Sequence, residues 1–263
     1  MMILDDILIR AGFGFLLGLL LGSFAGMASW RWLRKTSWWG RSQCPGCGRK
    51  LGPSDLIPIL SYFIKNKICS CGNKISARYP VIEGLTATLS ALIFMKYGFT
   101  LLGALGLVFV LILVLIIVID WENYIIPNRL VLLLFVFGIA WRWNVEGTWV
   151  AALTGIAAGL MLFLTAFLAA FIVERMNEQE SMGGGDLKLL FAAGPWVGFK
   201  VLPALLLLSG LFGILSYFIW KRLDVPTKQS ADVPLGAFPY GPAICMAIFA
   251  TVMLEELLSK LLF

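Results

Sequence analysis

Apolar stretches long enough to cross a lipid bilayer recur along this 263-residue sequence, and they constrain its fold more than any other feature. A helix that spans the hydrocarbon core needs about 20 mostly apolar residues. Hydrophobic residues make up 60% of the chain, above the roughly 45–50% usual for soluble domains. The alternating pattern of membrane β-strands is not seen, so the sequence predicts an all-α integral membrane protein.

The apolar stretches predict about eight transmembrane helices. The first follows two acidic residues and precedes a basic cluster, so we expect a permanent helix and not a cleaved signal peptide. Residues 187–220 could instead form one broken helix, which would give seven spans, although Gly194-Pro195 and Gly198 favour a break. The expected spans are residues 7–29, 80–97, 99–119, 128–143, 148–173, 187–198, 201–220 and 237–258.

Basic residues predict how these spans are oriented. With the N-terminus outside and eight spans, 16 of the 21 Lys and Arg residues fall on segments that face the cytoplasm. Such an excess is what the positive-inside rule describes. It places the segment of residues 30–79, Asp120 and Asp186 on one cytoplasmic face. The basic residues left outside are Arg10, Lys96, Arg142, Lys200 and Lys260.

Residues 30–79 form a polar insert between the first transmembrane helix, within residues 1–29, and a polytopic membrane domain at residues 80–263. The insert carries ten basic residues and a single acid, Asp55. Nucleic-acid binding is one interpretation of this charge. We favour orientation charges that also contact the anionic head groups of the bilayer, and we expect no nucleic-acid partner.

Four cysteines in the insert form two close pairs, Cys44 with Cys47 and Cys69 with Cys71, each followed by glycine. Two short chelating turns of this kind are typical of a four-thiolate zinc site. A metal would also supply folding energy to an insert too small for a large core. The alternatives are unligated thiols or two disulfides, and a reducing cytoplasm disfavours the disulfides. We therefore predict structural zinc, and a core position for Cys245.

Two acids stand at the ends of spans in a chain that has no histidine: Asp120 and Asp186. Without histidine there is no Ser-His-Asp triad, Cys-His pair or HExxH zinc site. Two carboxyls that share one proton can act as acid and base together. Taken singly, Asp186 could cap a helix that begins at Leu187, and Asp120 could form a turn before Pro127.

Three glycines and a lysine accompany Asp186. Gly183, Gly184 and Gly185 would let enzyme backbone approach an extended peptide, and they could act as a hinge that completes the site. Lys188 either orients Asp186 or is an interfacial cation.

These motifs together resemble the bifunctional prepilin peptidases (type IV leader peptidases), which are membrane aspartic peptidases of the GxGD class. The resemblance covers nearly the whole chain. The sequence departs from the family pattern at Gly26, at Tyr240 and in the shortened second cysteine pair, but at neither aspartate. The matching segments are Gly22-Ser23-Phe24 with Arg31, the cysteine pairs with Asp55-Leu56-Ile57-Pro58 between them, Arg78-Tyr79-Pro80 with Glu83, Asp120 with Ile126-Pro127, Gly183-Gly184-Gly185-Asp186 with Lys188-Leu189-Leu190, and Pro239-Tyr240-Gly241-Pro242.

The resemblance implies an aspartic endopeptidase that removes the basic leader of type IV prepilins or pseudopilins at the cytoplasmic face of the bacterial inner membrane. It makes Asp120 and Asp186 the catalytic pair, one as base for water and the other as a protonated group that polarises the carbonyl. It also implies N-methylation of the new N-terminus from S-adenosylmethionine. That activity rests on resemblance alone, because no G-x-G-x-x-G motif follows a strand.

Two other functions fit part of the pattern. One is a different intramembrane aspartyl protease, against which the cysteine insert argues. The other is an ion-coupled transporter that uses the two aspartates as ligands. The expected position of both acids at one face of the membrane, and not at its middle, argues against transport.

Overall fold

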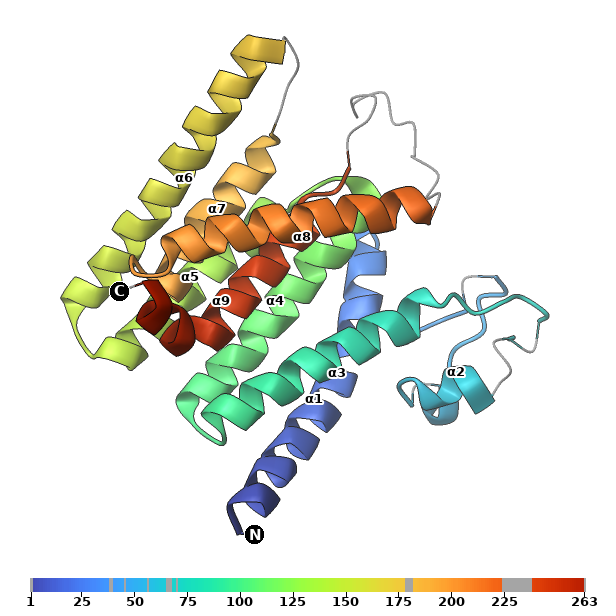
Figure 1. The fold of residues 1–263 in the computed structure, drawn as a ribbon. Coiled ribbons are helices and arrows are strands. Elements are labelled where there is room, and N and C mark those ends of the chain that lie inside the picture. Colours follow the sequence, from blue (N-terminus) through green and yellow to red (C-terminus); the bar gives the residue numbers. More distant parts are fainter. Residues whose placement is uncertain are drawn as a thin grey trace. The chain divides into compact units, whose positions relative to one another are not determined.

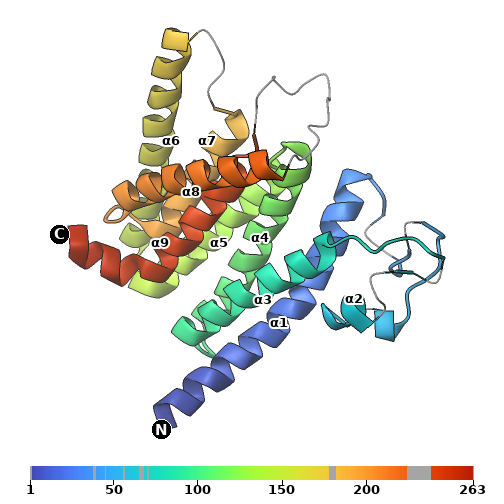
Figure 2. The ribbon, with the colours of Figure 1, turned by 45° about the vertical axis from the view of Figure 1, so that its right-hand side comes forward.

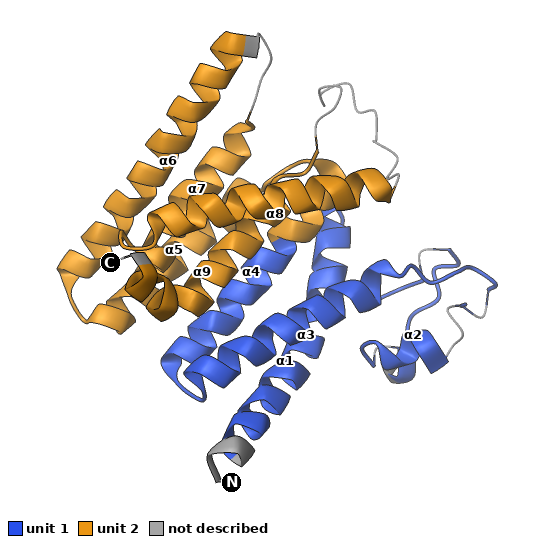
Figure 3. Cartoon of the chain, in the orientation of Figure 1, with its two compact units in different colours: residues 1–115 blue, residues 116–263 orange. Residues whose placement is uncertain are grey.

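The computed structural model describes residues 2–37, 40–44, 46–55, 57–64, 68–69, 71–177, 182–223 and 238–262. Every regular element within these residues is a helix (Figure 1). Packing divides the chain into two compact units, Met1–Leu115 and Ile116–Phe263, and the boundary falls inside one helix (Figure 3).

A helix occupies each predicted apolar stretch. Five of them (α1, α4, α6, α8 and α9) are long and apolar enough to cross a membrane, which confirms the prediction of a multi-span helical protein. Eight spans remain a prediction, because α7 has 14 residues and α3 and α5 are less apolar. The helices are α1 (Met2–Leu33), α3 (Arg78–Tyr97), α4 (Leu101–Asn123), α5 (Asn128–Glu146), α6 (Trp149–Asn177), α7 (Gly184–Val197), α8 (Leu202–Arg222) and α9 (Gly241–Leu262).

Among its described residues, the polar insert contains two short helical elements, a 3-10 turn at Pro53–Asp55 (η1) and α2 at Leu60–Ile64. Two isolated antiparallel bridges, Gln43 with Lys50 and Ile68 with Lys74, flank the cysteine pairs. So little regular structure agrees with an insert that depends on a local clip for its fold.

In the first unit, α1 and α3 lie side by side through a stripe of glycines (Figures 1 and 2). A Cβ atom added at Gly18 would lie 2.6 Å from Ala87 Cα, and one at Gly22 would lie 2.6 Å from Glu83 Cα. Residue numbers fall along α3 as they rise along α1, so the two helices are antiparallel. Small residues at every fourth position are how membrane helices bring their backbones together.

In the second unit, α7 packs against α5, α6 and α9 (Figure 2). Gly159 of α6 lies against the Phe191 carbonyl, which Pro195 leaves without its helical N–H donor. The Trp196 indole donates to Leu134 O of α5 at 2.8 Å, where Gly138 leaves room for the ring. These close contacts fix α7 along its length even though it contains a proline.

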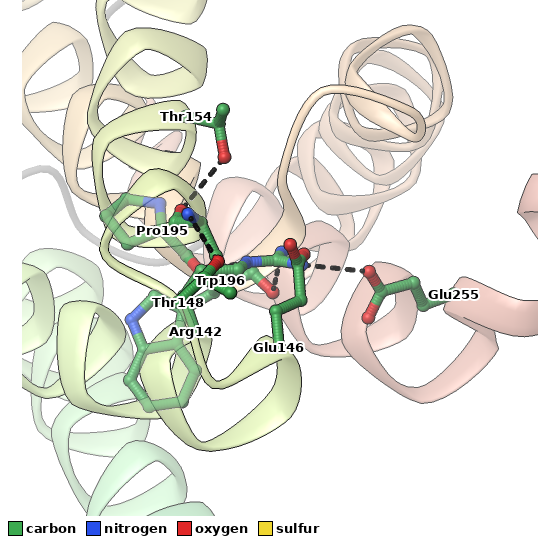
Figure 4. Close-up of polar contacts among 8 residues, drawn as sticks. Arg142, Glu146, Thr148, Thr154, Pro195, Trp196 and Glu255 are labelled. Atoms are coloured by element: carbon green, nitrogen blue, oxygen red, sulfur yellow. Dashed lines mark hydrogen bonds and ion pairs between the residues drawn. The ribbon is translucent and has the colours of Figure 1, made fainter.

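Arg142 of α5 holds the C-terminal end of α7 (Figure 4). Its guanidinium donates to Pro195 O at 3.0 Å and to Trp196 O at 3.1 Å, carbonyls that the end of a helix leaves without partners. It also pairs with Glu146 at 3.0 Å and with Glu255 of α9 at 3.4 Å. The residue is only 4% exposed, so this charge is part of the packed protein.

The glycine stripe predicts different effects on stability for two substitutions on the same helix. Gly18→Ala should lower the thermal unfolding temperature, because its methyl group meets the backbone of α3 and such overpacking costs about 1–3 kcal/mol. Gly12→Ala should be neutral or slightly stabilising, since the space beside Gly12 is open and alanine favours helix by about 1 kcal/mol. Thermal unfolding of both variants in detergent measures this, and equal effects would contradict the packing.

Candidate active site

Asp120 lies in the last turn of α4 and is 5% exposed. The helix ends just after it, where Tyr124 adopts a positive φ of 58° and its N–H donates to Asp120 O at 2.8 Å. The loop to α5 therefore begins within one turn of Asp120. A position at the end of a helix, next to a turn, leaves this side chain free to face neighbouring helix termini.

The carboxylate of Asp120 accepts the backbone N–H of Gly241, the first residue of α9, at 2.9 Å. A Cβ atom at position 241 would lie 2.7 Å from Asp120 Oδ2, so glycine is required for this approach. This contact gives Gly241 a role that the sequence did not predict. Gly241 lies in the Pro239-Tyr240-Gly241-Pro242 motif, but the motif does not show that its N–H donates to Asp120.

Asp186 lies in the first turn of α7. The helix begins at Gly184 and not at Leu187, so the alternative in which Asp186 caps a helix from Leu187 is wrong. Gly183 is the cap, and its carbonyl accepts the Asp186 N–H at 3.1 Å. The Asp186 carboxyl bonds back to the Gly183 N–H, as the third helical residue of a capping box does. This reciprocal pair orders a glycine-rich helix start that has low helix propensity.

Ile126 links the two aspartates. Its side chain would lie 3.1 Å from a Cβ at Gly241 and 3.2 Å from a Cβ at Gly185. The Ile126-Pro127 loop thus packs between the starts of α7 and α9, and it brings together two acids that are far apart in the sequence. Burial is the main cause that raises the pKa of Asp186 to about 7, and the charge of Asp120 raises it further.

The other predicted site residues lie around the start of α7. Gly183 and Gly184 are exposed, and the space beside Gly184 is open. Gly185 packs on Ile126 instead. Lys188 donates to Asn128 Oδ1, at the start of α5, at 3.2 Å, so it ties α7 to α5.

The four insert cysteines form one cluster in the first unit. The sulfurs of Cys44, Cys47, Cys69 and Cys71 all lie within 4.8 Å of one another, and the Cys44 and Cys71 sulfurs are 3.9 Å apart. All five cysteines, each within the described residues, are free thiols, and Cys245 is buried in α9 as expected. The cluster can hold a metal ion.

Each cysteine pair sits on a tight turn. Gly48 donates to Cys44 O and Gly72 donates to Cys69 O, both at 2.9 Å, and both glycines have positive φ, 71° and 85°. The second turn is one residue shorter than the first. It nevertheless brings Cys71 to the other thiols, so the C-x-C spacing is compatible with one four-sulfur cluster.

Comparison with known proteins gives two family matches. Residues 16–97 match the bacterial peptidase A24 N-terminal domain, and residues 107–218 match the type IV leader peptidase family. The first match contains the cysteine cluster and the second contains both aspartates. No solved structure matches the chain.

Several relatives, each called a prepilin leader peptidase/N-methyltransferase, cover most of the chain. The protein of Bacillus subtilis (strain 168) is 40% identical over 241 residues, which are 88% of this chain and 94% of that one. The protein of Pectobacterium carotovorum subsp. carotovorum is 31% identical over 225 residues, 84% of this chain and 77% of that one. That of Pseudomonas aeruginosa is 31% identical over 221 residues, 83% of this chain and 73% of that one.

The raised pKa of Asp186 predicts that Asp186→Asn stabilises the protein more as pH rises. Between the ordinary value of 3.8 and about 7, the folded state keeps a proton that the unfolded state releases. The contribution of Asp186 to the stability of the wild type therefore falls as pH rises through this window and levels off above it, whereas asparagine makes no such contribution. The difference between the two unfolding temperatures should be larger at about pH 8 than at about pH 5.

Thermal unfolding in detergent across this pH range is the measurement. Glu256→Gln, on an exposed turn of α9, is the control for loss of a surface carboxylate. A difference between Asp186→Asn and wild type that does not change with pH would contradict the raised pKa of the half-buried Asp186.

Proposed function

Because this chain belongs to the type IV leader peptidase family, we propose that it is a membrane aspartic endopeptidase that removes the basic leader of a type IV prepilin or pseudopilin. The observation that carries the proposal is that Ile126 packs on Gly185, next to Asp186, and on Gly241, whose N–H donates to Asp120. Two acids 66 positions apart thus share one packing partner. The relatives' name supplies the substrate class. The two carboxyls supply a chemistry that needs no histidine.

In this mechanism the pair shares one proton near neutral pH. Asp186 keeps the proton, and the Gly241 N–H stabilises the negative charge of Asp120. Asp120 takes a proton from water while the water oxygen bonds to the scissile carbonyl carbon, and Asp186 gives its proton to the carbonyl oxygen. The C–N bond then breaks as the leaving amine takes the proton held by Asp120, and the carbonyl re-forms as Asp186 recovers its proton.

The glycines before and within the first turn of α7 have different roles in this proposal. Gly183 and Gly184 are exposed, and the space beside Gly184 is open, so this segment suits contact with an extended peptide backbone. Gly185 serves packing on Ile126, and the bond from Lys188 to Asn128 holds the first turn of α7.

We further propose that the enzyme methylates the N-terminus that cleavage exposes, with S-adenosylmethionine as donor. The support is the second half of the relatives' name, N-methyltransferase. S-adenosylmethionine supplies an electrophilic methyl group on a sulfonium sulfur. The new N-terminal ammonium loses one proton to water, its nitrogen bonds to the methyl carbon, and the C–S bond breaks with its electron pair returning to sulfur.

Zinc is the metal that we assign to the cysteine cluster. Tetrahedral coordination with Zn–S bonds of about 2.3 Å places sulfurs about 3.8 Å apart, close to the Cys44–Cys71 separation of 3.9 Å. Two turns closed by glycine and an insert with little regular structure fit a structural site.

The proposed membrane arrangement follows the charge distribution. The first span within residues 1–29, the cysteine insert at residues 30–79 and the peptidase domain at residues 80–263 would place both aspartates at the cytoplasmic face of the bacterial inner membrane. α3, α5 and α7 would then complete eight spans within the bundle, and the basic insert would contact anionic lipid head groups.

Leader cleavage tests the catalytic pair. Asp120→Asn and Asp186→Asn should each lower the cleavage rate of a prepilin in detergent by roughly 10³-fold, since each removes one half of an acid–base pair. Gel mobility and mass spectrometry of the product report the cleavage. Glu122→Gln, on the same end of α4 as Asp120, is the matched control and should cleave as the wild type does. Full cleavage by either asparagine variant would refute the assignment.

Metal removal tests the zinc proposal. The purified protein should contain about one zinc per chain, and Cys71→Ser should lose it because three thiolates bind more weakly than four. Cys245→Ser removes the fifth thiol, far along the sequence in α9, and should keep the metal. Elemental analysis measures the content, and a chelator should make the insert sensitive to protease. Wild-type zinc content in Cys71→Ser would overturn the site.

A further inference from the structure

The first unit contains a cavity of about 910 Å³ that the peptidase chemistry does not use. Its walls come from the last turns of α1, from the insert and from the first turns of α3. The volume is within the range of about 300–1,000 Å³ typical of cofactor and small-molecule sites.

The cavity walls carry three kinds of recognition group. The aromatic side chains are Trp30, Tyr62 and Tyr79, with the Arg34 guanidinium 4.0 Å from the centre of the Trp30 ring. Aromatic and guanidinium faces of this kind can stack on a nucleobase. The charged groups have both signs: arginines from the end of α1, from the insert and from α3, and the carboxylates of Asp55 and Glu83.

Glu83 indicates most about the charge of a ligand, because it is an acid that is only 7% exposed in a wall rich in arginine. Its Oε2 accepts the Ile59 N–H at 2.6 Å, and Ser23 also bonds to it. A carboxylate has about four acceptor sites, so these contacts hold Glu83 in place without using its full capacity. A buried acid so fixed suits a ligand that brings a positive charge.

We propose that this cavity is the S-adenosylmethionine site, an inference that rests on the methyl transfer proposed above. The donor has an adenine for the aromatic wall, a carboxylate for the arginines, and a sulfonium and an ammonium for the acids. The Asp55 carboxylate already pairs with Arg49 at 3.3 Å, so Glu83 is the acid that would meet the positive charge of the ligand. The phosphate of an anionic lipid would meet the same arginines, but Glu83 would repel it.

The cysteine cluster forms part of the same cavity. Cys44, Gly46, Cys69 and Asn73 all line it, and a Cβ atom at Gly46 would clash with the Asn73 side chain, so the two cysteine turns pack directly together. A metal that joins these turns therefore also holds one wall of the cavity. The proposal gives the insert a task in methyl transfer, and donor binding should weaken when the metal is removed.

Direct binding of S-adenosylmethionine to the whole protein in detergent, measured by calorimetry, tests the proposal. Met27→Trp places a large ring into the cavity from α1 and should weaken the affinity at least about 10-fold. Phe24→Trp is the matched control: the same helix and the same new residue, but at a side chain that is 44% exposed and does not line the cavity. It should bind as the wild type does.

Glu83→Gln provides a second variant that keeps the shape and the acceptor for Ile59. Loss of its charge should weaken binding about 10-fold, the size of a lost charge-assisted hydrogen bond. Zinc content and thermal unfolding of each variant show whether the insert is still folded.

The outcomes separate this proposal from the function on which it rests. If the wild type neither binds the donor nor yields a methylated product by mass spectrometry, methyl transfer itself is refuted, and this site with it. If the wild type binds and methylates but both variants retain wild-type affinity, the site lies elsewhere and only this proposal is overturned. Binding of short-chain phosphatidylglycerol that Glu83→Gln strengthens, without donor binding, would also overturn it.

Discussion

Close approach of helix backbones is the constraint on which both units depend. Between membrane helices there is no hydrophobic gain to drive association, so packing at short range must supply it. Gly14, Gly18 and Gly22 bring α1 against α3, and Gly159 with Gly194 brings α6 against α7. The second contact decides where α7 stands, and α7 carries Asp186 in its first turn. Glycine packing deep in the bundle thus sets the position of a carboxyl group at its end.

The two aspartates lie at helix ends of opposite polarity. Asp186 lies at the start of α7, where the helix dipole and the Gly183 N–H favour negative charge. Asp120 lies at the end of α4, where the dipole opposes negative charge, and the Gly241 N–H from the start of α9 offsets this. Burial and mutual repulsion nevertheless outweigh the favourable terms at Asp186 and raise its pKa. This repulsion is what the mechanism proposed above uses, since two carboxyls that repel each other favour a state with one proton between them.

The sequence predicted the helices well because apolar runs of bilayer length have few alternatives. It placed the start of α7 three residues late, because glycines are poor helix formers and the bond from Asp186 back to Gly183 cannot be read from propensity. The contacts of Ile126 with Gly185 and Gly241 join distant segments, so no local pattern reveals them. The packing face of α1 is predictable from the sequence, since Gly14, Gly18 and Gly22 recur at every fourth position. The sequence could not predict whether the C-x-C pair joins a four-sulfur cluster, because that depends on the geometry of the turn at Gly72.

Two of the arginines counted as orientation charges are buried in the protein. A charge orients a membrane protein when it stays among water and lipid head groups at the end of a span. Arg142, counted among the few outer charges, is buried and donates to the last carbonyls of α7, so it acts as a cap and not as an orientation signal. Arg31 on the other side is also buried and donates to Gly40 O. The insert arginines Arg34, Arg41 and Arg49 are exposed, so they can still act as orientation charges. One buried arginine is thus set aside on each side, so the charge asymmetry from which the orientation is predicted persists.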